Sequence, residues 1–130
     1  MLLRQIFDPH LAQYAYLVGC QRTGEALLID PERDIDRYRE MAAENDLRIT
    51  AVAETHIHAD FVSGGREFAQ DPNVDLYLSA EGGPDWTYQW PAGRPRTHFL
   101  KHGDRFMVGN IRVEAVHTPG HTPEHLSYLI

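Results

Sequence analysis

The chain has 130 residues, 42% of them hydrophobic and 24% charged, a composition typical of one soluble globular domain spanning residues 1–130. Nineteen acidic residues against twelve basic ones give a formal net charge of -7, which argues against general binding to nucleic acid or to an anionic membrane. The single cysteine, Cys20, cannot form an internal disulfide, and no apolar run has transmembrane length. We therefore expect a soluble protein of the reducing cytoplasm.

Three strands are predicted first, at residues 2–7, 13–19 and 25–30, and their close succession indicates an antiparallel beginning. From residue 34 to about 46 the pattern becomes helical, with apolar residues on one face and Asp34 as the expected N-cap. A short apolar strand at 49–54 follows. This strand-helix-strand unit predicts a parallel pair of strands with a right-handed crossover.

The second half of the chain is predicted to alternate short strands with turns. A short helix within 61–69 and a strand at 74–79 come first, followed by a long loop at 80–95 that carries three aromatic residues. Further strands are expected at 98–100, 105–108, 111–116 and 126–130. The sequence thus predicts an α/β domain with a mixed β-sheet and helices on one face.

Candidate metal ligands are concentrated where the strand at 49–54 ends. His56, His58 and Asp60 alternate along the chain, so in an extended segment their side chains would point to the same side. Imidazole and carboxylate ligands suit zinc or iron better than magnesium or calcium. A second cluster, with histidines at 117, 121 and 125, follows the strand at 111–116 and is expected to add ligands.

These motifs resemble those of the metallo-β-lactamase superfamily, in its order and at its spacing. The residues that carry the resemblance are Asp30 with Pro31, the run 55–60, the turn at 101–104, and the run 117–122. The segments 54–64 and 121–128 are similar to the persulfide dioxygenase branch, whose members can continue into rhodanese domains. The resemblance implies the N-terminal half of an αββα sandwich.

The function implied by this branch is oxidation of a thiol persulfide to sulfite with dioxygen at a mononuclear iron(II). His56 and His121 match the family's histidine ligands, and the expected metal-binding set is His56, His58, Asp60 and His121. Within this set, we expect His58 and Asp60 to support or complete catalysis, with Asp60 orienting an imidazole or capping the next helix. His117 is expected to hold its turn through backbone hydrogen bonds.

Phe61 separates this sequence from the dinuclear zinc hydrolases of the superfamily, which have a histidine directly after the aspartate. A benzyl group cannot bind a metal, so one iron is favoured over two zinc ions. The alternative is a zinc-dependent thioester hydrolase of glyoxalase II type.

The family's ligand aspartate lies downstream of the second cluster, and the sequence finishes at Ile130 before reaching it. A third hypothesis is therefore a catalytically inactive half-domain. Because the later half of the sandwich is missing, we expect the inner face of the sheet to be exposed and to pair two copies into a homodimer.

Overall fold

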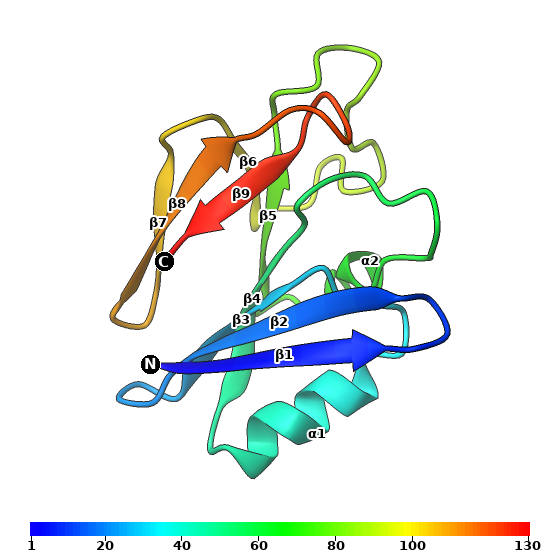
Figure 1. Ribbon diagram of the computed structural model, residues 1–130. Helices are drawn as coiled ribbons and strands as arrows, with labels where there is room; N and C mark the ends of the chain where they lie inside the picture. The colour runs from blue at the N-terminus through cyan, green and yellow to red at the C-terminus, as the bar shows by residue number, and fades with distance from the viewer.

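The computed structural model describes residues 1–130 and consists of two sheets with two helices (Figure 1). The elements are β1 (Leu2–Asp8), β2 (Gln13–Cys20), β3 (Glu25–Ile29), α1 (Asp36–Glu44), β4 (Arg48–Ala53), α2 (Gly65–Phe68), β5 (Asp75–Ser79), β6 (Thr97–Leu100), β7 (Arg105–Val108), β8 (Ile111–His117) and β9 (Leu126–Leu129). Strands β1 to β6 form one sheet in sequence order, and β7, β8 and β9 form the second. The predicted α/β class with a mixed sheet is confirmed.

The first sheet changes from antiparallel to parallel at β3. Strands β1, β2 and β3 pair antiparallel, as expected for segments joined by short turns, whereas β3, β4, β5 and β6 pair parallel. Helix α1 forms the crossover between β3 and β4, which confirms the predicted strand-helix-strand unit. Parallel strands bring their carboxyl ends to one edge, so Asp30 and Glu54, which follow β3 and β4, are neighbours.

The N-terminus of α1 differs from the prediction. The helix begins at Asp36 with Ile35 as its N-cap, and no side chain bonds to the free N–H groups there. Asp34 is therefore not the cap. The negative charge of Asp36 in the first turn still interacts favourably with the helix dipole.

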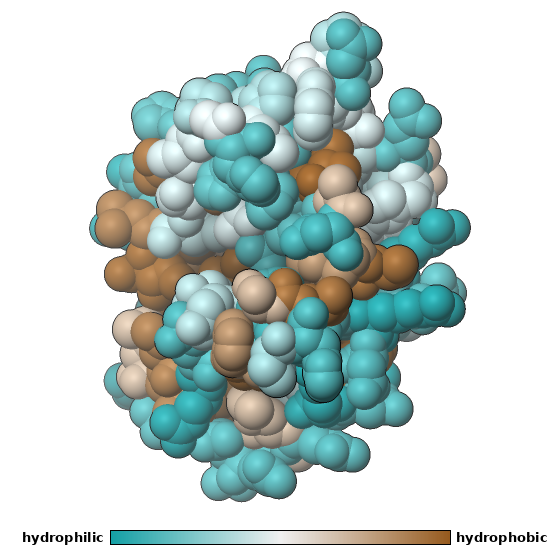
Figure 2. All heavy atoms as spheres, turned by 45° about the vertical axis from the view of Figure 1, so that its right-hand side comes forward, coloured by the Kyte–Doolittle hydropathy of each residue, from teal (hydrophilic) through white to brown (hydrophobic).

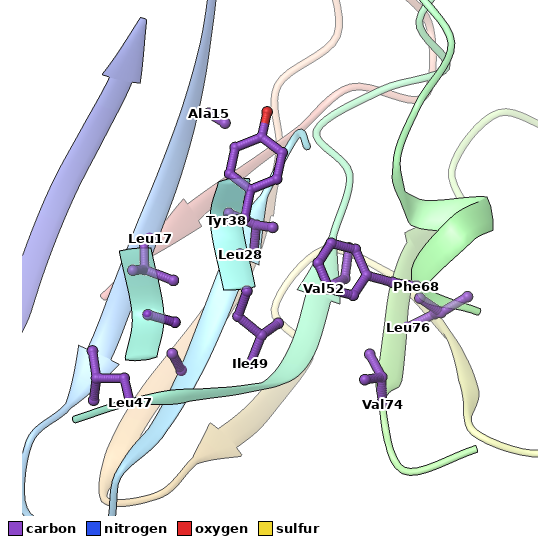
Figure 3. Packing of buried hydrophobic residues seen from close by; sticks show 12 residues of the cluster. Ala15, Leu17, Leu28, Tyr38, Leu47, Ile49, Val52, Phe68, Val74 and Leu76 are labelled. Carbon is purple, nitrogen blue, oxygen red and sulfur yellow. The ribbon is translucent and has the colours of Figure 1, made fainter. Parts of the chain in front are cut away.

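One face of the first sheet is covered by both helices, as predicted. Twelve buried residues form this core, among them Tyr38 from α1, Val52 from β4 and Phe68 from α2 (Figure 3). All three are almost completely buried. The position of Phe68 in this layer places α2 directly behind the loop that carries the candidate ligands.

The opposite face of the first sheet is partly covered by the second sheet. Twelve buried residues lie between the two sheets, and the rings of Tyr77 and Phe106 stack there with centroids 3.7 Å apart. The expectation that this inner face is exposed therefore holds for only part of the sheet. Strands β7 to β9 form part of the second layer, because their alternating apolar residues are buried against the inner face of the first sheet.

The inner side of β1 and of the start of β2 remains uncovered, whereas Val18 further along β2 is buried between the sheets. Leu3, Phe7 and Tyr14 are 56%, 50% and 42% exposed, and Figure 2 shows apolar atoms gathered in a band across the middle of one face. Strand β9 lies at the edge of its sheet, and the exposed Leu129 and Ile130 are at its end. Edge strands and apolar patches of this kind favour association.

The homodimer stays a prediction, and its interface is now restricted to the uncovered inner side of β1 and of the start of β2. The double substitution Leu3→Glu with Phe7→Glu is expected to convert a dimer into a monomer, because charges in a buried interface are strongly unfavourable. Light scattering after size exclusion at micromolar concentration measures the result. The substitution Met107→Glu, on the outer side of the second sheet, serves as the control, and a monomeric unmodified protein would refute the prediction.

Neither helix has the length and apolar character that crossing a membrane requires.

Candidate metal centre

The four residues predicted to bind metal line one cavity of about 250 Å³ at the carboxyl ends of β3 and β4. They are His56, His58, Asp60 and His121. The predicted alternation along an extended segment does not occur, because the chain leaves the strand at Ala53 and bends repeatedly before α2. Each side chain consequently has a different environment.

His56 and His121 face each other across the cavity. Their ring centroids are 4.7 Å apart and the ring planes are nearly perpendicular, at 82°. Burial, followed by the charge of nearby His58, lowers the pKa of His56 to about 4. A neutral imidazole is the form that binds a metal, so His56 is ready to act as a ligand at neutral pH.

A hydrogen-bonded chain orients His56. The Oγ1 hydroxyl of Thr55 donates to Oδ2 of Asp30 at 2.7 Å, and Nδ1 of His56 lies 2.8 Å from the same hydroxyl oxygen. Because the hydroxyl proton is directed to Asp30, Nδ1 of His56 is the donor in the second bond, which leaves Nε2 as the unprotonated nitrogen. This arrangement is typical of metal-binding histidines, whose second nitrogen donates to a supporting group.

His58 points its Nε2 between a pair of carboxylates. Its Nε2 lies 3.0 Å from Oδ1 of Asp30 and 3.2 Å from Oε2 of Glu54. Burial alone would lower the pKa of His58, but the hydrogen bonds and charges of the two carboxylates outweigh it and raise the pKa to about 10. Glu54 is fully buried, which raises its pKa, and it also accepts a hydrogen bond from Ser63.

Asp30, Glu54 and His58 place ligand atoms within 4.8 Å of one another. A pKa raised to about 10 favours the imidazolium form of His58 at neutral pH, and a cation bound at this point would have to displace its proton. His58 therefore acts as a structural cation here, and only its Nδ1 has no partner among the carboxylates. Asp60 is exposed at the rim of the cavity and does not cap α2, whose N-cap is Gly64.

The raised pKa of His58 predicts alkaline destabilisation of the metal-free protein. A histidine with a folded-state pKa near 10 and an unfolded value near 6.5 contributes its full stability below pH 6.5 and loses it as the pH rises to 10. Urea unfolding at intervals between pH 6 and pH 10 measures the free energy of unfolding. The variant His58→Gln should lack this slope, and an equal slope in both proteins would contradict the assignment.

Asp30 organises this region from an unusual backbone conformation. Its φ of 52° lies in the left-handed region, which aspartate tolerates better than most residues. Its carboxylate accepts hydrogen bonds from the backbone N–H and hydroxyl of Thr55, and its carbonyl accepts one from Gln13. Sequence reasoning used Asp30 only to recognise a family motif and assigned no role to Thr55 or Glu54. The sequence signal that could have identified Asp30 and Glu54 is an acidic residue at the end of each of two buried apolar strands.

The second loop is held by its own histidines. Nε2 of His117 lies 2.7 Å from the carbonyl oxygen of Pro123, and Nδ1 of His125 lies 2.9 Å from the hydroxyl of Thr118. The expected structural role of His117 agrees with this contact. The ring of His125 lies beside His56, with centroids 5.3 Å apart.

The loop at 80–95 covers the other side of His56 and His58. Tyr88, Trp90 and Phe61 line a pocket of about 460 Å³ together with the two histidines. Tyr88 is buried and Trp90 packs partly against the core, whereas Trp86 is exposed. A cavity with the neutral imidazole of His56 on one side and an aromatic pocket beside it can hold a metal next to a small substrate.

The sequence matches the model of the family described as "Metallo-beta-lactamase superfamily" over residues 8–130. The chain belongs to this superfamily. Among its curated relatives, the mitochondrial persulfide dioxygenase ETHE1 of Bos taurus is 31% identical over 134 residues, covering 100% of this chain and 48% of the relative. Hydroxyacylglutathione hydrolase of Nitrosococcus oceani is 34% identical over 128 residues, covering 97% of this chain and 46% of the relative. The chain thus spans about half the length of the curated relatives it matches.

Solved structures of the superfamily are similar over nearly the whole chain. A metallo-beta-lactamase from Staphylococcus aureus has a TM-score of 0.91 and 49% identity, and the match covers 99% of this chain and 38% of that one. ETHE1 from Myxococcus xanthus has a TM-score of 0.84 and 35% identity, with 99% and 53% covered. Membership of the superfamily and these relatives imply a metal cofactor. The neutral imidazole of His56, opposite His121, fits that requirement.

Proposed function

We propose that this chain is the metal-binding N-terminal part of a mononuclear iron(II) persulfide dioxygenase. His56 and His121 would hold the iron, and the carboxylate of a 2-His-1-carboxylate site would come from outside residues 1–130 or from Asp60 at the cavity rim. The reducing cytoplasm predicted from the single cysteine remains part of this proposal.

The observation that carries the proposal is that neither Nε2 of His58 nor the side chain of Phe61 offers a free donor beside the first metal position. Nε2 of His58 is engaged by Asp30 and Glu54, and the ring of Phe61 lies against His58 with centroids 4.4 Å apart. A dinuclear zinc site needs further donors on this side of the cavity. A single metal with open coordination positions is therefore favoured.

When bound, the iron supplies the redox chemistry that activates dioxygen. One dioxygen and one water convert the outer sulfur of a persulfide RSSH into sulfite, leaving the thiol RSH and two protons. Thr55 and Asp30 would keep Nε2 of His56 unprotonated and directed at the metal. Tyr88 and Trp90 would exclude water from the pocket and take up the apolar part of the thiol.

A second candidate function is zinc-dependent hydrolysis of a thioester. It is supported by the 34% identity to hydroxyacylglutathione hydrolase of Nitrosococcus oceani, which is similar to the 31% and 35% identity to the ETHE1 proteins of Bos taurus and Myxococcus xanthus. The two reactions have different requirements, since only the dioxygenase consumes oxygen.

The test measures oxygen uptake and sulfite release with glutathione persulfide, and thioester cleavage with S-lactoylglutathione, in protein loaded with iron(II) or with zinc. The assay should include both this chain and any longer protein that contains it. Oxygen uptake only in the iron-loaded protein is the expected result. Stoichiometric zinc with thioester cleavage and no oxygen uptake would refute the dioxygenase.

A further inference from the structure

One buried side chain joins the two loops that carry the candidate ligands. Oε1 of Glu124 accepts a hydrogen bond from the backbone N–H of Ile57 at 2.6 Å, across 67 positions of sequence. Ile57 directly follows His56, and Glu124 lies in the same short loop as His121. The contact therefore spans the two sides of the metal cavity.

A backbone hydrogen bond secures the other flank of His56. The N–H of Leu126 donates to the carbonyl oxygen of Thr55 at 2.8 Å. The residues immediately before and after His56 are thus both bonded to the segment 124–126. This pairing resembles a short β-bridge in which a carboxylate oxygen replaces one backbone acceptor.

The buried position of Glu124 is unfavourable for a carboxylate side chain that would serve only to fill space. Its exposed fraction is 0%, and Oε2 has no hydrogen-bond partner. Burying a carboxylate with an unsatisfied oxygen costs free energy that an apolar side chain would avoid. Glu124 is not the only contact that holds this loop, because His117 and His125 also bond across it.

We propose that Glu124 is a positioning residue that sets the separation of the His56 and His121 rings, and thereby the affinity of the site for a metal. It acts through Ile57 and touches neither the metal nor the substrate. The inference rests on the proposed function only in requiring a metal at His56 and His121. It depends neither on the identity of that metal nor on the reaction.

Metal binding in variants of Glu124 tests the role of this residue. Cobalt(II) is titrated into the metal-free protein, its visible d–d absorption is recorded, and a competing chelator gives the affinity. Glu124→Ala is expected to weaken cobalt binding by about 10- to 100-fold, the usual effect of removing a group that supports a metal ligand. Glu124→Gln keeps an oxygen that can accept from Ile57 and should bind cobalt more nearly as the unmodified protein does.

Glu114→Ala is the matched control, because it removes a carboxylate that pairs with Arg105 at 2.7 Å, away from the cavity. It should leave the cobalt affinity and spectrum unchanged. Thermal unfolding of each metal-free variant separates a general loss of stability from a change at the site.

An affinity and a d–d spectrum unchanged in Glu124→Ala would overturn the proposal, even if that variant melted at a lower temperature. Should Glu124→Ala fail to fold, Glu124→Asp takes its place, since one methylene fewer withdraws the oxygen from Ile57 while keeping the charge. Unchanged cobalt binding in Glu124→Asp would then overturn the proposal. A lack of cobalt binding by the unmodified protein would overturn it as well. Cobalt binding with no persulfide oxidation in the iron-loaded protein would refute the proposed function alone.

Discussion

Replacing His121 with alanine is expected to weaken metal binding by more than about 100-fold, because losing a supporting group alone costs 10- to 100-fold and a direct ligand contributes more. His121 is exposed at the cavity rim, so its removal leaves no buried void and the protein should still fold. Metal content after dialysis, together with chelator competition, gives the affinity. Oxygen uptake on glutathione persulfide should fall in parallel.

The control for this experiment is His98→Ala. His98 lies on β6, where its Nε2 is 2.8 Å from Asp75, and it is not among the residues lining the cavity. Its substitution should leave metal binding unchanged. A His121→Ala protein that retains its metal would show that the centre uses other ligands and would refute the assignment.

The second large effect is expected from Asp30→Ala. This change removes the acceptor for the N–H and hydroxyl of Thr55 and one of the two carboxylates that surround His58. Removing one partner of a buried ion pair typically costs about 3–5 kcal/mol. Alanine also tolerates the left-handed φ of 52° less well than aspartate, which adds to the loss.

Urea unfolding of metal-free Asp30→Ala measures this destabilisation. Asp30→Asn is the informative comparison, because asparagine tolerates the same backbone conformation and keeps one acceptor oxygen. It should lose less stability than alanine. Equal, small losses in both variants would indicate that the network around His58 contributes little to folding.

The positions of the elements could be predicted from the sequence alone. Alternating and continuous apolar runs identified all nine strands to within about two residues at each end. The crossover helix could be predicted equally well from the stripe of apolar residues along one of its faces. Local signals of this kind are sufficient because side-chain burial repeats with the period of the element.

The direction of each ligand side chain could not be predicted in the same way. His56 and His58 have the same residue type and the expected alternate spacing, yet one faces His121 and the other faces Asp30 and Glu54. The difference depends on where the end of β3 meets the end of β4. The two strand ends meet because β3 and β4 pair in parallel across residues 25–53. The spacing of residues within one motif carries no information about that pairing.

The sequence by itself determined the α/β class, the family motifs, and the choice of His56 and His121 as the matches to the family's histidine ligands. Only the tertiary structure decided that β7 to β9 cover part of the inner sheet face, that His58 lies between the carboxylates of Asp30 and Glu54, and that Glu124 joins the two ligand loops. The physical reason is that burial and charge pairing depend on residues far apart in the chain. Hydrogen bonds such as that between Glu124 and Ile57 exist only after both sheets have packed.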